Sequence, residues 1–208
     1  MDKCSISKAT LGRLPGYLNC LRNLPPDEVL YISATAIAKK LDLGEVQVRK
    51  DLACVSGEGK PKLGYVTAEL IQKLEDCLGY NKLTPAVLVG AGRLGKALLQ
   101  YDEFEHYGVK ISAAFDTDKN VIGTVSKTQI LPMEQFEDFC KANEIRLGII
   151  TVDKSSAQEV CNRMVESGIN AIWNFAPYKL VVPENVLLKN ENLALSLAHL
   201  NNQLCKPN

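Results

Sequence analysis

The most constraining feature of this sequence is a glycine-rich turn between a strand and a helix. Residues 86–89 have the pattern of a short buried strand and run directly into Gly90-Ala91-Gly92-Arg93-Leu94-Gly95. A helical pattern follows over residues 96–101, and a second strand, Val109 to Phe115, ends in Asp116. A G-x-G-x-x-G segment alone is weak support, but an acid 21 residues after its last glycine completes the pattern. This order of elements predicts a Rossmann-like unit that binds a dinucleotide.

Each glycine of this segment has its own expected role. Gly90 permits the tight turn, Gly92 lets a pyrophosphate approach the backbone, and Gly95 lets the helix pack closely on the strand. The helix N-terminus adds unpaired N–H groups and a positive dipole for phosphate. Asp116 is expected to accept a hydrogen bond from a ribose 2′-hydroxyl and to repel a 2′-phosphate, which favours NAD over NADP. The expected cofactor is NAD(H), with these candidate ligands: Gly90, Ala91, Gly92, Arg93, Leu94, Gly95 and Asp116.

Further β/α repeats predict a doubly wound parallel sheet, so this part belongs to the α/β class. Strands are expected at 147–152 and 171–175, and helices at 133–143 and 155–167. Because ligands of such sheets bind at the carboxyl ends of the strands, the additional cofactor candidates lie near those ends: Asp118, Thr151, Val152, Asn174 and Phe175.

Less specific interpretations of these residues remain open. Asp118 is typical of a turn, and Trp173 and Phe175 are typical of core packing. The same pattern also fits a Rossmann-like unit that holds no ligand, another adenine nucleotide or coenzyme A.

The first 80 residues have a different pattern, in which apolar residues recur at helical spacing. One stripe belongs to a first helix, with Pro15 in its first turn: Leu14, Tyr17, Leu18, Leu21 and Leu24. Ser33 is a good N-cap for a second helix, and a tight turn at Gly44 leads to a third, from Glu45 to about Val55. Two short helices joined by such a turn are typical of a helix-turn-helix.

The third helix has a polar outer face. Val48, Leu52 and Val55 face the core, so Lys50 lies about 200° from Val48 at 100° per residue. The segment 57–65 then resembles a glycine-rich hairpin with two lysines near its tip, and Thr67 is expected to cap a fourth helix. These elements predict a winged helix, with the following candidates for contacts with double-stranded DNA: Gln47, Arg49, Lys50, Lys60 and Lys62.

A plain helical bundle with a solvated face remains an alternative for this part. Residues 39–62 hold six basic and four acidic side chains, so their local excess of positive charge is small. Over the whole chain the 24 Lys and Arg balance the 24 Asp and Glu, which excludes a generally polycationic coat for nucleic acid.

Composition also bounds the cellular context. No apolar run approaches the roughly 18 residues of a membrane span, and the start MDKCSISKAT is not a secretory signal. The seven scattered cysteines include no Cys-x-x-Cys pair, which favours reduced thiols in the cytoplasm over a disulfide framework or a zinc site. The two histidines, His106 and His199, leave little material for a metal or acid–base site. No catalytic or metal-ligating residue is expected.

The chain therefore divides into three expected parts: a winged-helix domain at 1–80, a Rossmann-like domain at 81–187 and a C-terminal helix at 188–208. That helix carries leucines spaced four, three and four apart: Leu193, Leu197, Leu200 and Leu204. It packs either on the chain's own Rossmann-like domain or on a partner subunit, and the spacing alone does not decide.

In order and spacing, these pieces resemble the Rex family of bacterial redox-sensing transcriptional repressors over nearly the whole chain. The residues that carry the resemblance are Ala9-Thr10, Arg13-Leu14-Pro15 and Tyr17, Val48 to Leu52, Gly90 to Gly95, Phe115 to Asp118 with Ile122-Gly123, and Asn174 to Pro177. The resemblance implies a homodimer with domain-swapped C-terminal helices. It also implies that operator DNA is bound in the apo or NAD⁺ state and is released when NADH binds.

Two departures from the family pattern bear on that switch. Family members commonly have Asp and then Phe where Asn192 and Leu193 stand here, and in the family that Asp partners the residues that match Arg13 and Tyr101. Tyr101 is also expected beside the cofactor. Asn192 supplies no negative charge and Leu193 has no ring to cover the nicotinamide, so we expect a weakened or lost response to NADH. The altered wing at 54–62 puts the family's operator sequence in doubt.

Two other functions compete with the repressor. A small NAD-dependent oxidoreductase needs a substrate domain with an acid–base residue, but about 20 residues remain beyond the expected end of the Rossmann-like part near 185. A nucleotide-binding interaction protein would use the basic hairpin to meet another protein. The sequence favours a protein that is not an enzyme.

Overall fold

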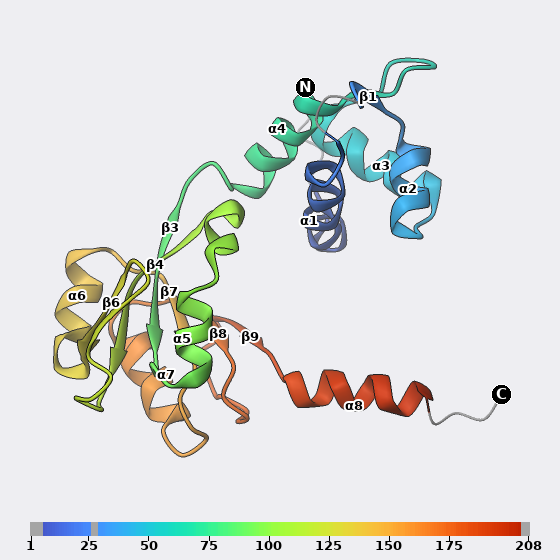
Figure 1. Cartoon of the computed structure of the whole chain (residues 1–208). Coiled ribbons are helices and arrows are strands. Elements are labelled where there is room, and N and C mark those ends of the chain that lie inside the picture. The colour runs from blue at the N-terminus through green and yellow to red at the C-terminus, as the bar shows by residue number, and fades with distance from the viewer. Residues whose placement is uncertain (1–5, 26–28, 205–208) are drawn as a thin grey trace. The chain divides into compact units, whose positions relative to one another are not determined.

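The computed structural model describes residues 6–25 and 29–204, and the chain divides into two compact units, Met1–Lys82 and Leu83–Asn208. The first unit is a winged helix made of six elements (Figure 1): α1 (Lys8–Arg22), β1 (Tyr31–Ile32), α2 (Ala34–Leu41), α3 (Glu45–Ser56), β2 (Tyr65–Val66) and α4 (Thr67–Leu78). The short strands β1 and β2 pair in antiparallel fashion. The predicted fold class is therefore confirmed for this unit.

Side-chain caps define the helix starts in the first unit. The Ser7 hydroxyl accepts a hydrogen bond from the Thr10 N–H at 3.1 Å, and the Ser33 hydroxyl caps α2 in the same way through Ala36. The expected N-cap role of Ser33 is confirmed. Because α1 begins after Ser7, Pro15 lies inside the helix and not in its first turn, so that prediction is wrong.

Two further expectations for the first unit need correction. Thr67 is the first residue of α4 and not its cap, since the preceding Val66 holds that position. The segment 57–65 forms a tight loop closed by an antiparallel bridge between Lys60 and Gly64. Lys60 therefore lies at the base of the loop, and Lys62 lies within the turn.

The second unit is a seven-stranded Rossmann-like sheet with the strand order β5-β6-β4-β3-β7-β8-β9. Its strands are β3 (Thr84–Val89), β4 (Val109–Asp116), β5 (Gly123–Val125), β6 (Thr128–Pro132), β7 (Leu147–Ile150), β8 (Ala171–Asn174) and β9 (Leu187–Asn190). All neighbours run parallel except β5 and β6. The predicted doubly wound sheet is confirmed, and β5, β6 and β9 are strands that the sequence pattern did not predict.

Helices connect these strands and cover both faces of the sheet. They are α5 (Arg93–Leu99), α6 (Phe136–Ala142) and α7 (Ala157–Glu166), with 3-10 turns η1 (Asp102–Tyr107) and η2 (Met133–Gln135). One buried cluster includes residues of α6 and α7, and a separate cluster includes residues of α5. The parallel neighbours β3 and β7 mark the point where the strand order reverses, because the chain builds β4 and β6 on one side of β3 and β7 and β8 on the other. Their carboxyl ends therefore form the crevice where such folds bind ligands.

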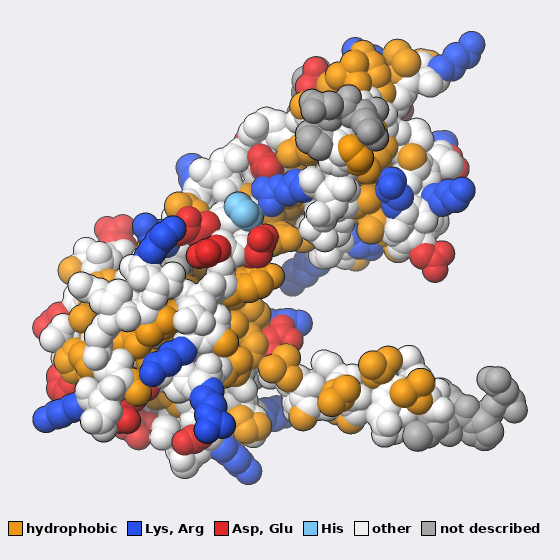
Figure 2. Space-filling view, in the orientation of Figure 1, with side chains coloured by type: hydrophobic (Ala, Val, Ile, Leu, Met, Phe, Trp, Pro, Cys, Tyr) orange, Lys and Arg blue, Asp and Glu red, His pale blue; other side chains and the backbone are white. Residues whose placement is uncertain are grey.

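The last element is α8 (Leu193–Leu204), in which no described side chain is buried. Its stripe leucines are between 55% and 80% exposed: Leu193, Leu197, Leu200 and Leu204. Figure 2 shows hydrophobic side chains along this helix. Within the described part of the chain, no helix is both long enough and apolar enough to cross a bilayer.

Candidate nucleotide and nucleic-acid sites

The glycine turn after β3 gives each glycine a distinct environment. Gly90 has a φ of +102°, and a Cβ there would lie 2.8 Å from the carbonyl carbon of Thr151. A Cβ on Gly95 would lie 2.1 Å from the Gly90 oxygen, so only glycine lets α5 pack this closely. Gly92 has no atom within 4 Å of its ideal Cβ position. Two of the glycines are thus required by the fold, whereas the space beside Gly92 is open.

Asp116, at the end of β4, is hydrogen-bonded to backbone on both carboxylate oxygens. Oδ2 accepts from the Ala91 N–H at 2.6 Å, and Oδ1 accepts from the Asp118 N–H at 2.9 Å. The carboxylate therefore fixes the glycine turn while remaining at the mouth of the crevice. Asp118 accepts from the Asn120 backbone and side-chain amides at 2.9 and 2.7 Å, an arrangement typical of a turn residue.

A cavity of about 310 Å³ lies at these strand ends and brings together five of the candidate residues: Gly90, Gly92, Asp116, Thr151 and Val152. The Thr151 hydroxyl donates to the Gly90 carbonyl at 2.7 Å and so ties β7 to the turn. Met133 and Val160 add an apolar wall, which suits a base ring. Sequence reasoning missed these two residues, although both fall within predicted helices at the strand ends.

Eight candidates of the second unit do not line this cavity: Ala91, Arg93, Leu94, Gly95, Tyr101, Asp118, Asn174 and Phe175. Asn174 is 1% exposed, and its amide bonds to the backbone of Ala176 and Tyr178 and to the Asn190 side chain. Phe175 packs on Trp173, with ring centroids 4.5 Å apart. Tyr101 is 54% exposed and contacts Phe104 edge to face, whereas Asp118 forms the turn described above.

The same aromatic group extends to the segment before α8. Phe104 lies edge to face with Trp173 at 5.7 Å, and the Trp173 indole N–H donates to Glu191 at 3.3 Å. Asn192 then caps α8, because its side-chain oxygen accepts from the Leu195 N–H at 2.9 Å. Leu193 is 63% exposed.

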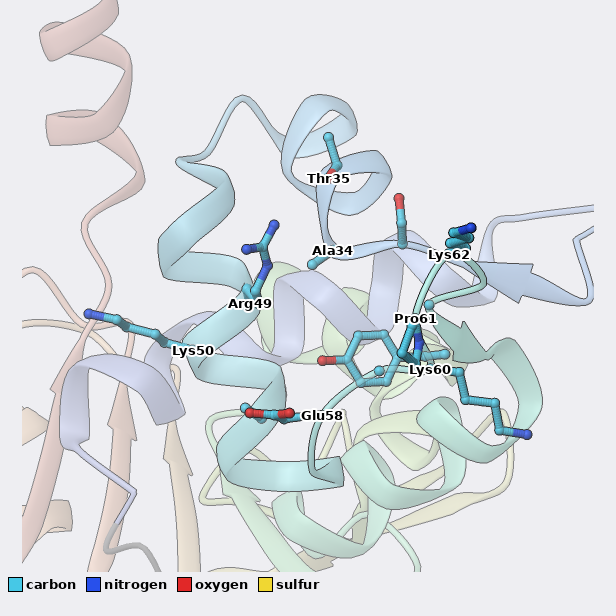
Figure 3. A pocket seen from close by; sticks show the side chains of 13 residues that line it. Ala34, Thr35, Arg49, Lys50, Glu58, Lys60, Pro61 and Lys62 are labelled. Atoms are coloured by element: carbon cyan, nitrogen blue, oxygen red, sulfur yellow. The ribbon is translucent and has the colours of Figure 1, made fainter.

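Four of the five DNA-contact candidates of the first unit line one hollow of about 570 Å³: Arg49, Lys50, Lys60 and Lys62. Figure 3 shows Arg49 and Lys50 on α3 and Lys62 on the loop across the hollow. Arg49 also pairs with Glu45 one turn earlier. Facing cations of this kind suit a polyanionic backbone.

The outer face of α3 includes a residue that sequence reasoning missed. Val46 is 63% exposed and lies four residues before Lys50, so both are on the same face. An exposed apolar side chain there can contact a thymine methyl group in a major groove. The i, i+4 spacing between Val46 and Lys50 is the sequence signal that could have identified Val46.

On the opposite side, α3 is joined to α1 by a buried carboxylate. Asp51 is 4% exposed, and both of its oxygens accept two hydrogen bonds. Oδ1 accepts from Thr10 Oγ1 at 3.0 Å and Arg13 Nη2 at 2.9 Å; Oδ2 accepts from Arg13 Nε at 2.8 Å and Tyr17 Oη at 2.7 Å. We refer to Thr10, Arg13, Tyr17 and Asp51 as the Asp51 cluster.

The cluster shifts the titration of its members. Burial alone raises the pKa of Asp51, but the hydrogen bonds from Arg13, Tyr17 and Thr10 outweigh burial and hold that pKa below its usual value. Burial, together with the hydrogen bond to the carboxylate, raises the pKa of Tyr17 to about 12. The carboxylate is therefore charged and the phenol neutral at physiological pH.

Comparison with known families matches both units. A family model described as a CoA binding domain matches residues 81–178, and one described as a putative DNA-binding protein N-terminus matches residues 5–53. The redox-sensing transcriptional repressor Rex of Treponema denticola is 42% identical over 192 residues, which are 92% of this chain and 91% of that protein. The protein of the same name from Clostridium botulinum is 38% identical and covers 98% of both chains.

Solved structures extend the match to three dimensions. The crystal structure of RSP in complex with β-NAD⁺ and operator DNA has a TM-score of 0.88 and 35% identity, and the match covers 96% of this chain and 92% of that one. RSP in complex with β-NADH has a TM-score of 0.85, 34% identity and coverages of 96% and 94%. The whole-length identity and the shared fold lead to one conclusion: the chain belongs to the Rex family of redox-sensing transcriptional repressors.

Proposed function

We propose that this chain represses transcription by binding operator DNA through its first unit and NAD(H) through its second. The observation that carries the proposal is the presence of both sites in one chain: an open glycine turn beside Asp116, and a cationic hollow beside α3. Arg49, Lys50 and Gln47 enter the major groove, while Lys60 and Lys62 contact phosphates. In the second unit, the dinucleotide contacts the glycine turn from Gly90 to Gly95 and the strand-end candidates that line the cavity: Asp116, Thr151 and Val152.

We propose further that the working form is a homodimer in the cytoplasm. The functional parts are 1–80, 81–187 and 188–208, with β9 lying across the last boundary. The exposed leucines of α8 support a helix that is buried by a second copy, in a domain-swapped arrangement. We assign the chain a regulatory and not a catalytic role, as in its relatives. Light scattering tests the dimer, and Leu197→Glu is expected to yield monomers.

The response to NADH is proposed to be weaker than in relatives that have Asp and Phe at the start of this helix. Asn192 supplies a cap but no charge, and Arg13 is already held by Asp51. Shifting an equilibrium between two dimer conformations from 1:99 to 99:1 requires the ligand to bind one conformation about 5.5 kcal/mol more tightly than the other. Leu193 and Asn192 contribute less to that difference than an aromatic ring and a carboxylate would.

A gel-shift assay on fragments of the host genome tests these proposals. DNA retardation that depends on Lys50 supports the repressor, and its absence under every cofactor condition contradicts it. NADH is then titrated against the complex of the wild type and of Asn192→Asp/Leu193→Phe. The double variant should release DNA more completely. Calorimetry gives the NADH concentration that saturates the wild-type protein. If the wild type releases all of its DNA at that concentration, the proposed weakening of the response is wrong.

A further inference from the structure

Gln47 lies at the edge of the outer face of α3, on the side of α1. On a helical wheel that starts at Val48, Gln47 is about 100° from the core direction, and Asp51 is about 60° from it on the same side. The Gln47 side chain is exposed, whereas Asp51 is buried against α1. Gln47 is thus exposed to solvent, and Asp51, one turn further along α3, is buried within the Asp51 cluster.

The orientation of the Gln47 amide is set by Arg13. A guanidinium offers only donors, so the amide oxygen and not the NH2 group must face it. In that orientation the oxygen lies 3.0, 3.1 and 3.2 Å from the Nη1, Nε and Nη2 atoms of Arg13. Three nearly equal distances place the oxygen over the guanidinium plane, where the positive charge attracts it. The amide NH2 group is left for another partner.

Arg13 in turn is not free to move. Its Nε and Nη2 atoms donate to the two oxygens of Asp51 at 2.8 and 2.9 Å, and the carboxylate is further fixed by Thr10 and Tyr17. The guanidinium plane therefore has a defined position between α1 and α3. Because a planar bidentate pair resists rotation, the surface that it offers to Gln47 is fixed as well.

We propose that Arg13 and Asp51 are positioning residues that make Gln47 a donor-only reader of DNA, an inference that rests on the DNA-binding function proposed above. A glutamine that reads adenine must present its oxygen to N6 and its NH2 to N7 at the same time. Here the oxygen faces the Arg13 guanidinium, so Gln47 presents only its NH2 donors to the DNA. The base edges that match are guanine, which presents N7 and O6 side by side, and next thymine through O4.

The test selects bound sequences from a pool of randomised duplexes with the full-length protein. The wild type should select guanine or thymine at one position of each half-site, and Gln47→Ala should lose that preference by about tenfold. Gln47→Glu keeps a partner for Arg13 but has only acceptors, so cytosine or adenine should replace guanine there. Gln72→Glu introduces the same charge on α4, where its side chain is exposed, and should select the wild-type sequence.

A second variant separates positioning from a merely structural role. Arg13→Lys keeps the positive charge near Asp51 but lacks a guanidinium plane. The freed amide should then accept adenine at the position that depends on Gln47. A merely structural Arg13 would lower the melting temperature and the affinity for all sequences alike, without changing the base selected.

The selection experiment distinguishes failure of the DNA-binding function from failure of the inference about Gln47. Selection of no sequence at all overturns the DNA-binding function itself. A selected sequence that stays the same in Gln47→Ala and Gln47→Glu, with both variants folded by circular dichroism, overturns the inference alone. So does adenine at the Gln47-dependent position in the wild type.

Discussion

The two candidate sites differ in whether backbone or side chains form them. The cavity of the second unit is shaped by backbone at Gly90 and Gly92, and Arg163 is the one cation among the described residues that line it. Arg163 is itself paired with Glu137 at 2.8 Å. The hollow of the first unit is instead lined by four long cationic side chains. We therefore expect a phosphate to meet backbone N–H groups in the second unit and cationic side chains in the first.

This difference determines how each site responds to change. A backbone site depends on space, so a single added side chain can close it. A site of several separate cations loses binding in small, roughly equal steps that vary with salt. Substitutions in the two units should therefore differ both in size and in kind.

The largest effect is expected at Gly92. Gly92→Val fills the open space beside the turn, so NADH binding should become undetectable by calorimetry while the melting temperature stays near that of the wild type. Gly12→Val is a matched control, because it also points into open space but lies in α1. Unchanged NADH affinity in Gly92→Val would remove the turn from the site.

Next in size is the loss of the buried carboxylate in the first unit. Asp51→Ala leaves Arg13 without its partner and should lower the free energy of unfolding by about 3–5 kcal/mol. Glu58→Ala, at an exposed acid of the same unit, should change it little. Equal stability of the two variants in urea titrations would show that the cluster does not stabilise the fold.

The lowered pKa of Asp51 gives this prediction a pH dependence. Its folded-state pKa is below the unfolded value of about 3.9, so the stabilisation is present above that pH and is lost as pH falls through the folded pKa. The gap in stability between wild type and Asp51→Asn should therefore narrow in acid.

A smaller effect is expected at Asp116. Asp116→Ala should weaken NAD⁺ binding by about 1.5–3 kcal/mol, the range for a hydrogen bond to a charged group. Part of that loss comes from the Ala91 N–H, which the carboxylate now holds. Asp118→Ala serves as the control, since its side chain serves the local turn. Calorimetry should show affinity falling in the first variant and not in the second.

The smallest effect belongs to a single wing lysine. Lys60→Ala should weaken DNA binding about equally for all sequences and reduce the slope of log affinity against log salt by about 1. Lys110→Ala, in β4 of the other unit, should leave the slope unchanged. A change in base preference on loss of Lys60 would mean that this residue reads a base and does not contact phosphate.

The sequence allowed accurate prediction of several features that neighbouring residues determine, although the local predictions for Pro15 and Thr67 were wrong. The strand, the glycine turn, the helix and Asp116 follow one another within a short segment, and the open position at Gly92 agrees with its expected role. The same holds for Ser33, whose hydroxyl caps the helix that directly follows.

Features that join distant segments were missed. Thr10 meets Asp51 across 41 residues, and no local pattern marks that contact. The strand β9 has mostly exposed side chains, so it lacks the alternation that predicts a strand, and pairing with β8 is what defines it. Asn174 was placed at a ligand pocket because it ends a strand, yet its side-chain amide donates to the side chain of Asn190 in β9.

The contact between Trp173 and Glu191 has a practical consequence. Trp173 is the chain's single tryptophan, so all indole fluorescence comes from one point. Its indole N–H donates a hydrogen bond to Glu191, which immediately precedes Asn192, the cap of α8. Any rearrangement that displaces Glu191 changes the polarity around the indole and with it the colour of the emitted light. The protein thus contains its own optical reporter for the base of α8, and no label needs to be attached.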